Sequence, residues 1–159
     1  MFKILFLFLL STLFLLANPI KFKEEKHINA LQSSIYKNGI LKIEDDFIEI
    51  IYKEDNKSFI FYDDHIILKT KEKEEILKYE ENIELSVFQK LIKCIYKNQQ
   101  EDLKEYFDIA NEDKKTILIP NEYLSNVIQR IEYKKIDNRL EFLKIYFVNE
   151  DWINIVQIN

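Results

Sequence analysis

From residue 22 onward, short apolar runs rich in Ile, Phe and Tyr alternate with acidic or Asn-containing turns. This layout is typical of a meander of β-strands. In residues 47–53, for example, Ile48, Ile50 and Tyr52 share one face of the extended chain, which is the two-residue period of a half-buried strand. We therefore expect strands near residues 22–28 and at residues 39–44, 47–53, 58–62 and 65–70.

The period of the apolar positions changes in the middle of the chain. Apolar residues recur at helical spacing from residue 83 to residue 97, which predicts an amphipathic helix with Asn82 as its cap. A second, shorter helix is predicted over residues 101–107. The charged stretches 71–75 and 111–115 flank this helical region, and each is suited to a solvated hinge.

Strands are expected again at residues 116–119, 127–136, 139–148 and 152–158. The predicted fold class is α+β, an antiparallel sheet of about eight or nine strands with two helices inserted midway. Some strands are apolar on both faces, so the sheet must be covered on both sides or must offer one face to an apolar ligand. A packed helix-on-sheet core and a lipid cavity fit this pattern about equally well.

The N-terminus has the three-part layout of a secretory signal peptide. Lys3 gives a positive start, residues 4–16 are almost wholly apolar, and Ala17 is a small residue at which cleavage could follow. The apolar run is shorter than the roughly 20 residues that a spanning helix needs. We expect a signal peptide at residues 1–17 and one exported domain at residues 18–159, the alternative being an uncleaved, membrane-tethered form.

Composition and charge narrow the function classes. The formal net charge is −5 and only Arg130 and Arg139 are arginines, so a clustered basic face for nucleic acid is not expected. Cys94 is the only cysteine, which excludes an internal disulfide. We interpret it as a small core side chain rather than a reactive thiol.

The sequence argues against an enzyme, a metal site or a cofactor site. A chain with one glycine cannot form a Gly-rich phosphate loop, and no Gly-x-Ser-x-Gly motif is present. The consecutive residues Asp63, Asp64 and His65 have metal-binding side chains, but neighbouring strand residues point to opposite faces and cannot readily converge. A polar hairpin turn is the simpler interpretation.

Several motifs, in order along the chain, resemble the LolA-like outer-membrane lipoprotein carrier family. The run Phe22-Lys23-Glu24-Glu25-Lys26 is similar to that family's opening Phe-x-Glu-x-Lys, and Gly39-Ile40-Leu41 is similar to its Gly-x-Leu strand start. Residues 91–107 resemble its helix and the short helix that follows, and residues 116–120 resemble its strand ending in Leu-x-Pro. The chain departs from the family at Glu150, where a glycine is usual, and in having no counterpart of the arginine that latches the lid.

The resemblance implies an unclosed, strongly curved antiparallel β-barrel with lid helices across its concave side and an apolar cavity between them. A protein of this class would be a periplasmic, monomeric carrier or chaperone that performs no chemistry. It would bind acyl chains of lipoproteins or lipids between an inner-membrane donor and an outer-membrane acceptor. The alternative is a non-catalytic periplasmic structural or interaction protein with a fully packed core.

The alternation of side chains and the helical spacing together predict the ligand-binding residues. From the strands we expect Ile48, Ile50, Tyr52, Phe59, Phe61, Leu143, Ile145 and Phe147. From the lid helix we expect Phe88, Leu91, Ile92 and Ile95.

One further motif stands apart from the cavity. Residues 54–58 place Asn56 in an Asn-x-Ser sequence with an acidic residue two positions earlier, in a loop expected to be exposed. An N-glycan acceptor and an ordinary polar turn are both consistent with it.

Overall fold

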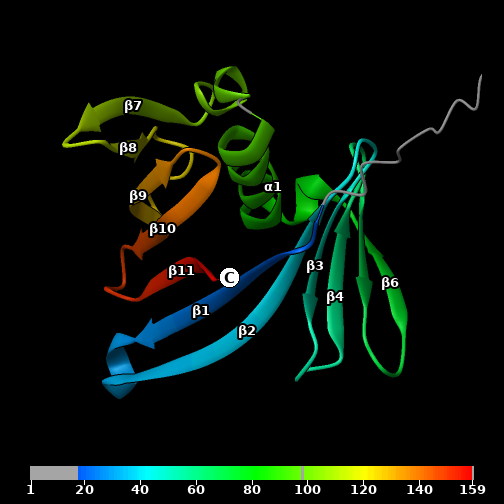
Figure 1. The fold of residues 1–159 in the computed structure, drawn as a ribbon. Helices are drawn as coiled ribbons and strands as arrows, with labels where there is room; N and C mark the ends of the chain where they lie inside the picture. The colour runs from blue at the N-terminus through cyan, green and yellow to red at the C-terminus, as the bar shows by residue number, and fades with distance from the viewer. Residues whose placement is uncertain (1–17, 98, 159) are drawn as a thin grey trace, which may run out of the picture.

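The computed structural model describes residues 18–97 and 99–158 and shows one open, curved sheet of 11 antiparallel strands (Figure 1). The predicted signal peptide at residues 1–17 lies outside the described residues. The strands, in chain order, are β1 (Ile20–Ile28), β2 (Ser33–Ile43), β3 (Ile48–Tyr52), β4 (Lys57–Phe61), β5 (Ile66–Lys69), β6 (Glu74–Leu77), β7 (Phe107–Glu112), β8 (Lys115–Pro120), β9 (Ile128–Ile136), β10 (Arg139–Phe147) and β11 (Trp152–Ile158).

The spatial order of the strands explains how the single helix comes to lie across the sheet. The order is β6-β5-β4-β3-β2-β1-β11-β10-β9-β8-β7, so the first and last strands are neighbours in the middle, with His27 paired to Trp152. The chain builds one half of the sheet outward to β6 and then crosses to the opposite edge at β7. That crossing contains the helix α1 (Ile83–Lys97), with the 3₁₀ turns η2 (Tyr79–Glu81) before it and η3 (Gln100–Leu103) after it. A further 3₁₀ turn, η1 (Asn29–Leu31), joins β1 to β2.

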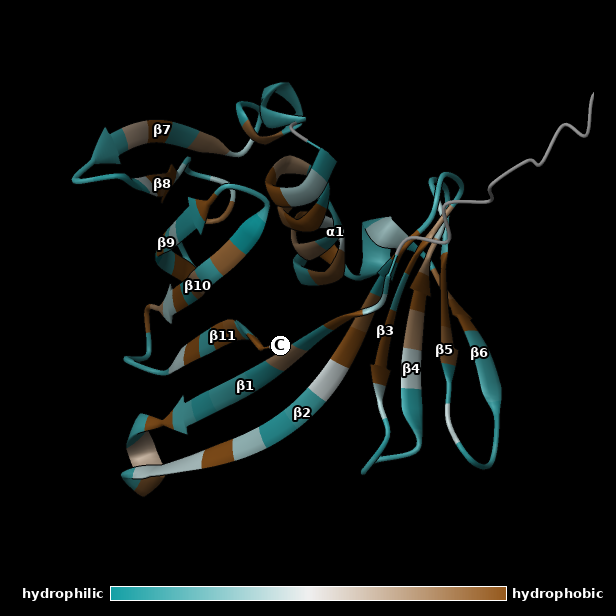
Figure 2. Cartoon of the chain, viewed as in Figure 1, coloured by the Kyte–Doolittle hydropathy of each residue, from teal (hydrophilic) through white to brown (hydrophobic). Residues whose placement is uncertain are grey.

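The core lies between the concave face of the sheet and α1 (Figure 2). Strand alternation directs Ile48, Ile50 and Phe61 to this face, and all three are buried. The helix contributes Leu91 and Ile95, which lie one turn apart and are 1% exposed each. Because α1 is amphipathic, burying this one face leaves its charged residues in solvent.

The start of α1 is defined by Asn82. Its carbonyl accepts a hydrogen bond from the backbone amide of Ser86, at 3.1 Å, which is the first bond of the helix. Its side-chain amide donates to the carbonyl of Lys78 at 2.9 Å. Asn82 therefore holds the entry of the chain into the helix through both its backbone and its side chain.

The prediction of a second helix at residues 101–107 is wrong. Only a 3₁₀ turn forms at Gln100–Leu103, and Phe107 begins strand β7 instead of ending a helix. The reason is the two-residue alternation that follows, in which Phe107 is buried, Asp108 is exposed and Ile109 is half-buried. Pairing with β8 satisfies the backbone of this segment, which a single turn of helix could not do alone.

The two stretches that were predicted to be hinges, residues 71–75 and 111–115, form parts of strands and turns. Residues 74–77 form β6, which pairs with β5, and residues 107–112 and 115–120 form the β7–β8 hairpin. Its two-residue turn consists of Asp113 and Lys114, with φ of 47° and 66°, the positive angles that a type I′ hairpin turn requires. Short, charged sequences suit tight hairpins as well as hinges, so the pattern alone does not distinguish the two. The strand count is accordingly higher than the eight or nine predicted from sequence.

Two other features bear on the predicted fold class. The coarse prediction of a curved antiparallel sheet with a helix is confirmed, and within the described residues the edge strands β6 and β7 do not pair with each other. Among the helices that the structure describes, none combines the length and the apolar character needed to cross a membrane.

Candidate ligand-binding site

A cavity of about 390 Å³ lies between the N-terminal half of α1 and the concave face of the sheet. Its floor is apolar and comes from both halves of the sheet and from the helix. The buried lining residues are Ile50, Phe61, Val87, Leu91, Ile128, Ile131, Ile145 and Ile155.

Most of the rim of the cavity is apolar too, but it is only partly buried. Large side chains that are only half-buried surround the opening, and they come from three strands and the helix. They are Phe59, Leu85, Phe88, Phe147 and Ile153. Half-buried aromatic and aliphatic side chains that face one space leave apolar surface exposed to water, which is unfavourable unless something occupies the space.

The helix reaches this site with one face. Leu85, Phe88 and Leu91 recur at three-residue steps and all line the cavity, as does Val87 one residue before Phe88. The ring of Phe88 lies 6.2 Å from that of Phe61 on β4, so helix and sheet meet through an aromatic pair at the edge of the cavity. The later helical turns carry Ile92 and Ile95, which are buried in the core away from it.

One end of the cavity is polar. The hydroxyl of Tyr52 donates a hydrogen bond to Oε2 of Glu24 at 2.6 Å, across from β3 to β1. Burial, and then the charge of Glu24, raise the pKa of Tyr52 far above its usual range, so this phenol stays protonated and remains the donor. The ring of Phe22 packs edge-on against that of Tyr52 at 5.9 Å. Lys26 and Glu84 complete the polar lining.

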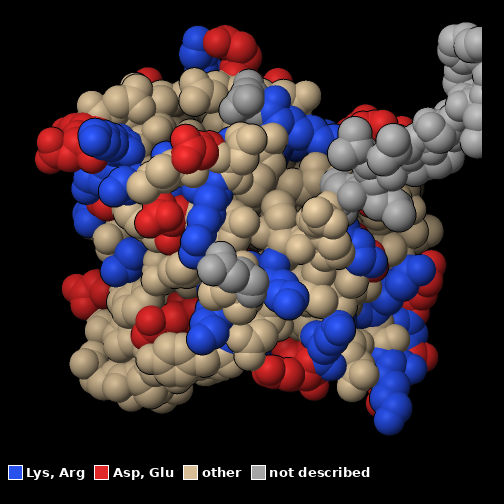
Figure 3. All heavy atoms as spheres, viewed as in Figure 1, with Lys and Arg blue, Asp and Glu red and all other residues tan. Residues whose placement is uncertain are grey.

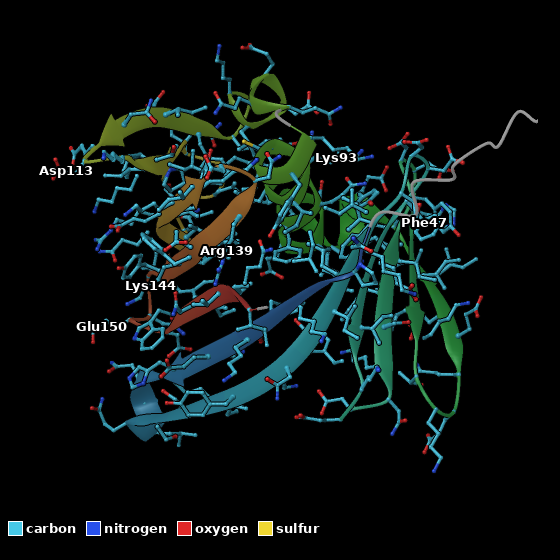
Figure 4. The ribbon with its side chains drawn as sticks, in the orientation of Figure 1. Phe47, Lys93, Asp113, Arg139, Lys144 and Glu150 are labelled. Atoms are coloured by element: carbon cyan, nitrogen blue, oxygen red, sulfur yellow. The ribbon has the colours of Figure 1, made fainter. Side chains whose placement is uncertain are left out.

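Several hydrogen bonds attach the middle and the C-terminal part of α1 to the sheet and its turns. Gln89 donates to the carbonyl of Tyr62 at 2.8 Å, and Lys93 forms an ion pair with Asp63 at 2.8 Å, both at the turn between β4 and β5. Figure 4 shows Lys93 extending from the helix toward that side of the molecule. Lys97 donates to the carbonyl of Glu44, and Lys135 of β9 donates to the carbonyl of Ile95.

These attachments leave the N-terminal turns of α1 as the part held chiefly by apolar contacts. Leu85 and Phe88, the half-buried helix residues of the cavity rim, precede the attached positions Gln89, Lys93, Ile95 and Lys97, whereas the buried lining residue Leu91 follows Gln89. The hydrogen bond from Lys93, and then its charge, lower the pKa of Asp63, so the ion pair persists to pH values below the ordinary range of a carboxylate. The helix is therefore fixed at one end and rests on the cavity at the other.

The structure brings together most of the residues that the sequence predicted for the site. The predicted residues that line the cavity are Ile50, Tyr52, Phe59, Phe61, Phe88, Leu91, Ile145 and Phe147. The others, Ile48, Ile92, Ile95 and Leu143, are buried in the core outside the cavity lining. Alternation along a strand assigns a face correctly, but it does not show where along that face the helix leaves a space.

Sequence reasoning missed the apolar contributions of two strands, β9 and β11. Ile128 and Ile131 of β9, and Ile153 and Ile155 of β11, line the cavity because their strands lie beside β10 in the sheet. Alternation within the predicted strand 152–158 was the signal available for the β11 pair. Ile128 could not be found in that way, because a register irregularity between Tyr146 and Phe147 displaces it from simple alternation with Ile131.

The other residues considered from sequence have structural partners. Asp64 contacts His65 at 2.7 Å and Asp63 contacts Lys93, and no group of three metal-binding side chains with a suitable arrangement occurs in the part of the chain that the structure describes. Cys94 is buried, with its sulfur 3.6 Å from the hydroxyl of Tyr133, and burial raises the pKa of its thiol. Asn56 is exposed in the β3–β4 turn with φ of 48°.

The charged surface is mixed. On the face drawn in Figure 3, basic and acidic side chains are interspersed around a central area of uncharged residues.

Comparison with known proteins identifies no relative. No protein-family model matches this chain, and a search among curated proteins finds no significant match. The apolar cavity beneath a helix that is attached at one end is therefore the feature from which function must be inferred.

Proposed function

We propose that this protein is a periplasmic carrier or chaperone that binds the acyl chains of lipoproteins or lipids and transfers them toward the outer membrane. The observation that carries the proposal is the cavity of about 390 Å³ whose floor is apolar and whose rim is largely apolar. Its volume lies in the range of about 300–1,000 Å³ that is usual for small-molecule sites.

The cavity favours a carrier over a protein with a fully packed core. Protein interiors contain few voids larger than a water molecule, and apolar voids that do exist are not stabilised by water. Here Phe59, Phe88 and Phe147 remain half-buried around one opening. An acyl chain in that space would gain about 0.8 kcal/mol for each methylene removed from water.

The helix suggests how a chain enters and leaves. Because Gln89, Lys93 and Lys97 hold the middle and the end of α1, movement of the residues before Gln89 would open the cavity without detaching the helix. Such a carrier needs no catalytic group and works as a monomer. An inner-membrane donor would load it, and an outer-membrane acceptor that offers a better apolar surface would unload it.

A direct test is to measure uptake of a fluorescent fatty acid by delipidated protein. We expect Phe88→Ala to weaken uptake by removing rim surface, because this side chain lines the cavity. Phe47→Ala is the matched control, since Phe47 (labelled in Figure 4) is also half-buried but lies outside the cavity lining. Its ring packs on that of Tyr62. Native mass spectrometry of protein from a periplasmic extract should in addition show a co-purifying acyl lipid.

Two results would contradict the proposal. If the protein takes up no acyl probe and is isolated only at its bare polypeptide mass, the packed-core alternative is correct. If Phe47→Ala weakens uptake as much as Phe88→Ala does, the cavity is not where the chain binds.

A further inference from the structure

Three charged side chains line the otherwise apolar cavity: Glu24, Lys26 and Glu84. Glu24 is half-buried on β1, Lys26 is exposed two residues further along the same face, and Glu84 is exposed in the first turn of α1. Two carboxylates and one ammonium give the lining of the cavity a net negative charge.

These three charged side chains form no close ion pair in the described part of the chain. Within residues 18–97 and 99–158, none of the three forms an ion pair within 4 Å, although nearby charged residues such as Lys37 and Asp55 do. In that part of the chain, the three charged side chains form only one side-chain hydrogen bond, which Oε2 of Glu24 accepts from Tyr52. Since that phenol stays protonated, the bond orients the carboxylate without reducing its charge.

The two glutamates differ in what stabilises their negative charge locally. A carboxylate in the first turn of a helix is stabilised by the helix dipole, which accounts for Glu84 without any ligand. Glu24 lies opposite Lys37 on β2, but Lys37 forms its ion pair with Asp55. The carboxylate of Glu24 instead accepts the hydrogen bond from Tyr52, and the other strand residues that line the cavity are nearly all apolar. A half-buried carboxylate without an ion pair beside an apolar cavity favours a cationic group bound next to an apolar chain.

We infer that the cavity prefers amphiphiles whose head group carries an ammonium over amphiphiles with an anionic head group of the same chain length. The inference rests on the proposed function, since it concerns the polar end of the same ligand. The ammonium would lie near Glu24 and Glu84, and any phosphate attached to it would face Lys26. Two sources share this chemistry: a zwitterionic phospholipid and the free amino group of a lipid-modified polypeptide.

The expected selectivity is modest, because the opening is solvated. Solvent-exposed ion pairs contribute roughly 0.2–1 kcal/mol, which corresponds to a factor of up to about five in affinity for each carboxylate. The factor should decrease with added salt, since exposed charges are screened over about 8–10 Å at ordinary ionic strength.

The experiment is displacement of a bound fluorescent acyl probe by three dodecyl amphiphiles, each used below its micelle concentration: dodecylamine, dodecanol and dodecanoate. We expect dodecylamine to displace the probe best and dodecanoate worst. The double variant Glu24→Gln and Glu84→Gln should lose this order, since glutamine at position 24 can still accept the hydrogen bond from Tyr52. Glu72→Gln is the matched control, because Glu72 is exposed in the β5–β6 turn, away from the cavity.

The outcomes separate the two proposals. If no amphiphile binds, the carrier function itself is wrong and the head-group preference fails with it. If all three bind equally, if dodecanoate binds best, or if Glu72→Gln alters the order as much as the double variant does, only the head-group inference is overturned.

A second measurement identifies the source of the ammonium. Vesicles containing equal amounts of phosphatidylethanolamine and phosphatidylglycerol are incubated with the delipidated protein, and a diacylated lipopeptide is offered with its amino group either free or acetylated. Enrichment of phosphatidylethanolamine indicates a phospholipid, and preference for the free amine indicates a lipid-modified polypeptide. The absence of either preference would count against the inference.

Discussion

The aromatic ring of Phe22 on β1 lies directly over Gly39 on β2, so that a Cβ atom at Gly39 would overlap the ring. The two residues are cross-strand partners, and Phe22 is 6% exposed. The same ring packs edge-on against Tyr52, the residue that binds Glu24 at the polar end of the cavity. The chain's only glycine therefore makes room for an aromatic side chain that supports the candidate site.

The contact between Phe22 and Gly39 predicts a coupled pair of mutations. Gly39→Ala should destabilise the protein by about 1–3 kcal/mol, because the ring must leave a packed position. In a Phe22→Ala background the same change should be neutral or stabilising, since alanine loses less entropy than glycine in a strand. Urea denaturation of the four proteins of this double-mutant cycle measures the difference. Additive effects would mean that the two residues do not interact.

Alanine substitutions should distinguish the part of α1 that lines the cavity from the part that packs in the core. Phe88→Ala, on the half-buried rim, should cost less than the usual 3–5 kcal/mol for a core phenylalanine while reducing retention of an acyl ligand. Ile95→Ala should cost about 2–5 kcal/mol with retention unchanged, because Ile95 is 1% exposed and lies outside the cavity lining. Thermal unfolding and lipid retention, measured on both variants, test this. A full core-sized loss for Phe88→Ala with normal retention would place the helix in a permanent core.

The attachments of α1 should control its opening. Replacing Gln89 by Leu removes the bond to the carbonyl of Tyr62, which keeps the hydroxyl of Tyr79 as a donor at 2.6 Å. The stability cost should therefore be only about 1 kcal/mol. Amide hydrogen exchange in α1 and release of a bound acyl probe should both become faster. Lys73→Met, which removes an exposed ion pair with Glu75 in the β5–β6 turn, is the control and should leave both rates unchanged.

Alkaline stability should depend on buried tyrosines. Burial, and then the contact with Cys94, raise the pKa of Tyr133 to about 12, and burial raises the pKa of Tyr96 to about 12. In the unfolded chain these phenols lose their protons near pH 10, so the unfolded state binds fewer protons above that pH. The free energy of unfolding should consequently fall between about pH 10 and pH 12.

The test compares two phenylalanine variants. Tyr133→Phe cannot ionise at this position, so its free energy of unfolding should fall less steeply over that range than that of the unmodified protein. Tyr123→Phe, at a residue that is 69% exposed, should follow the unmodified protein. Identical pH profiles for all three proteins would show that the burial of Tyr133 does not affect its ionisation.

Local patterns in the sequence determined the elements and their faces. Strand alternation depends only on neighbouring residues, and it correctly placed Ile48, Ile50 and Tyr52 on the concave face of the sheet. Helical spacing is equally local, and it correctly placed Leu85, Phe88 and Leu91 on the face of α1 that meets the sheet. The tight turn at Asp113 and Lys114 was misread as a hinge because the same polar residues suit both structures.

Only the tertiary structure decided which of these faces meet around a cavity. The pairing of β1 with β11 brings Glu24 beside Ile155, residues that lie at opposite ends of the described chain. The placement of α1 leaves space beneath Phe88 but packs Ile92 and Ile95 tightly, although all three have the same apolar character. Strand register and helix placement depend on many weak contacts between distant residues, so no local pattern in the sequence contains them.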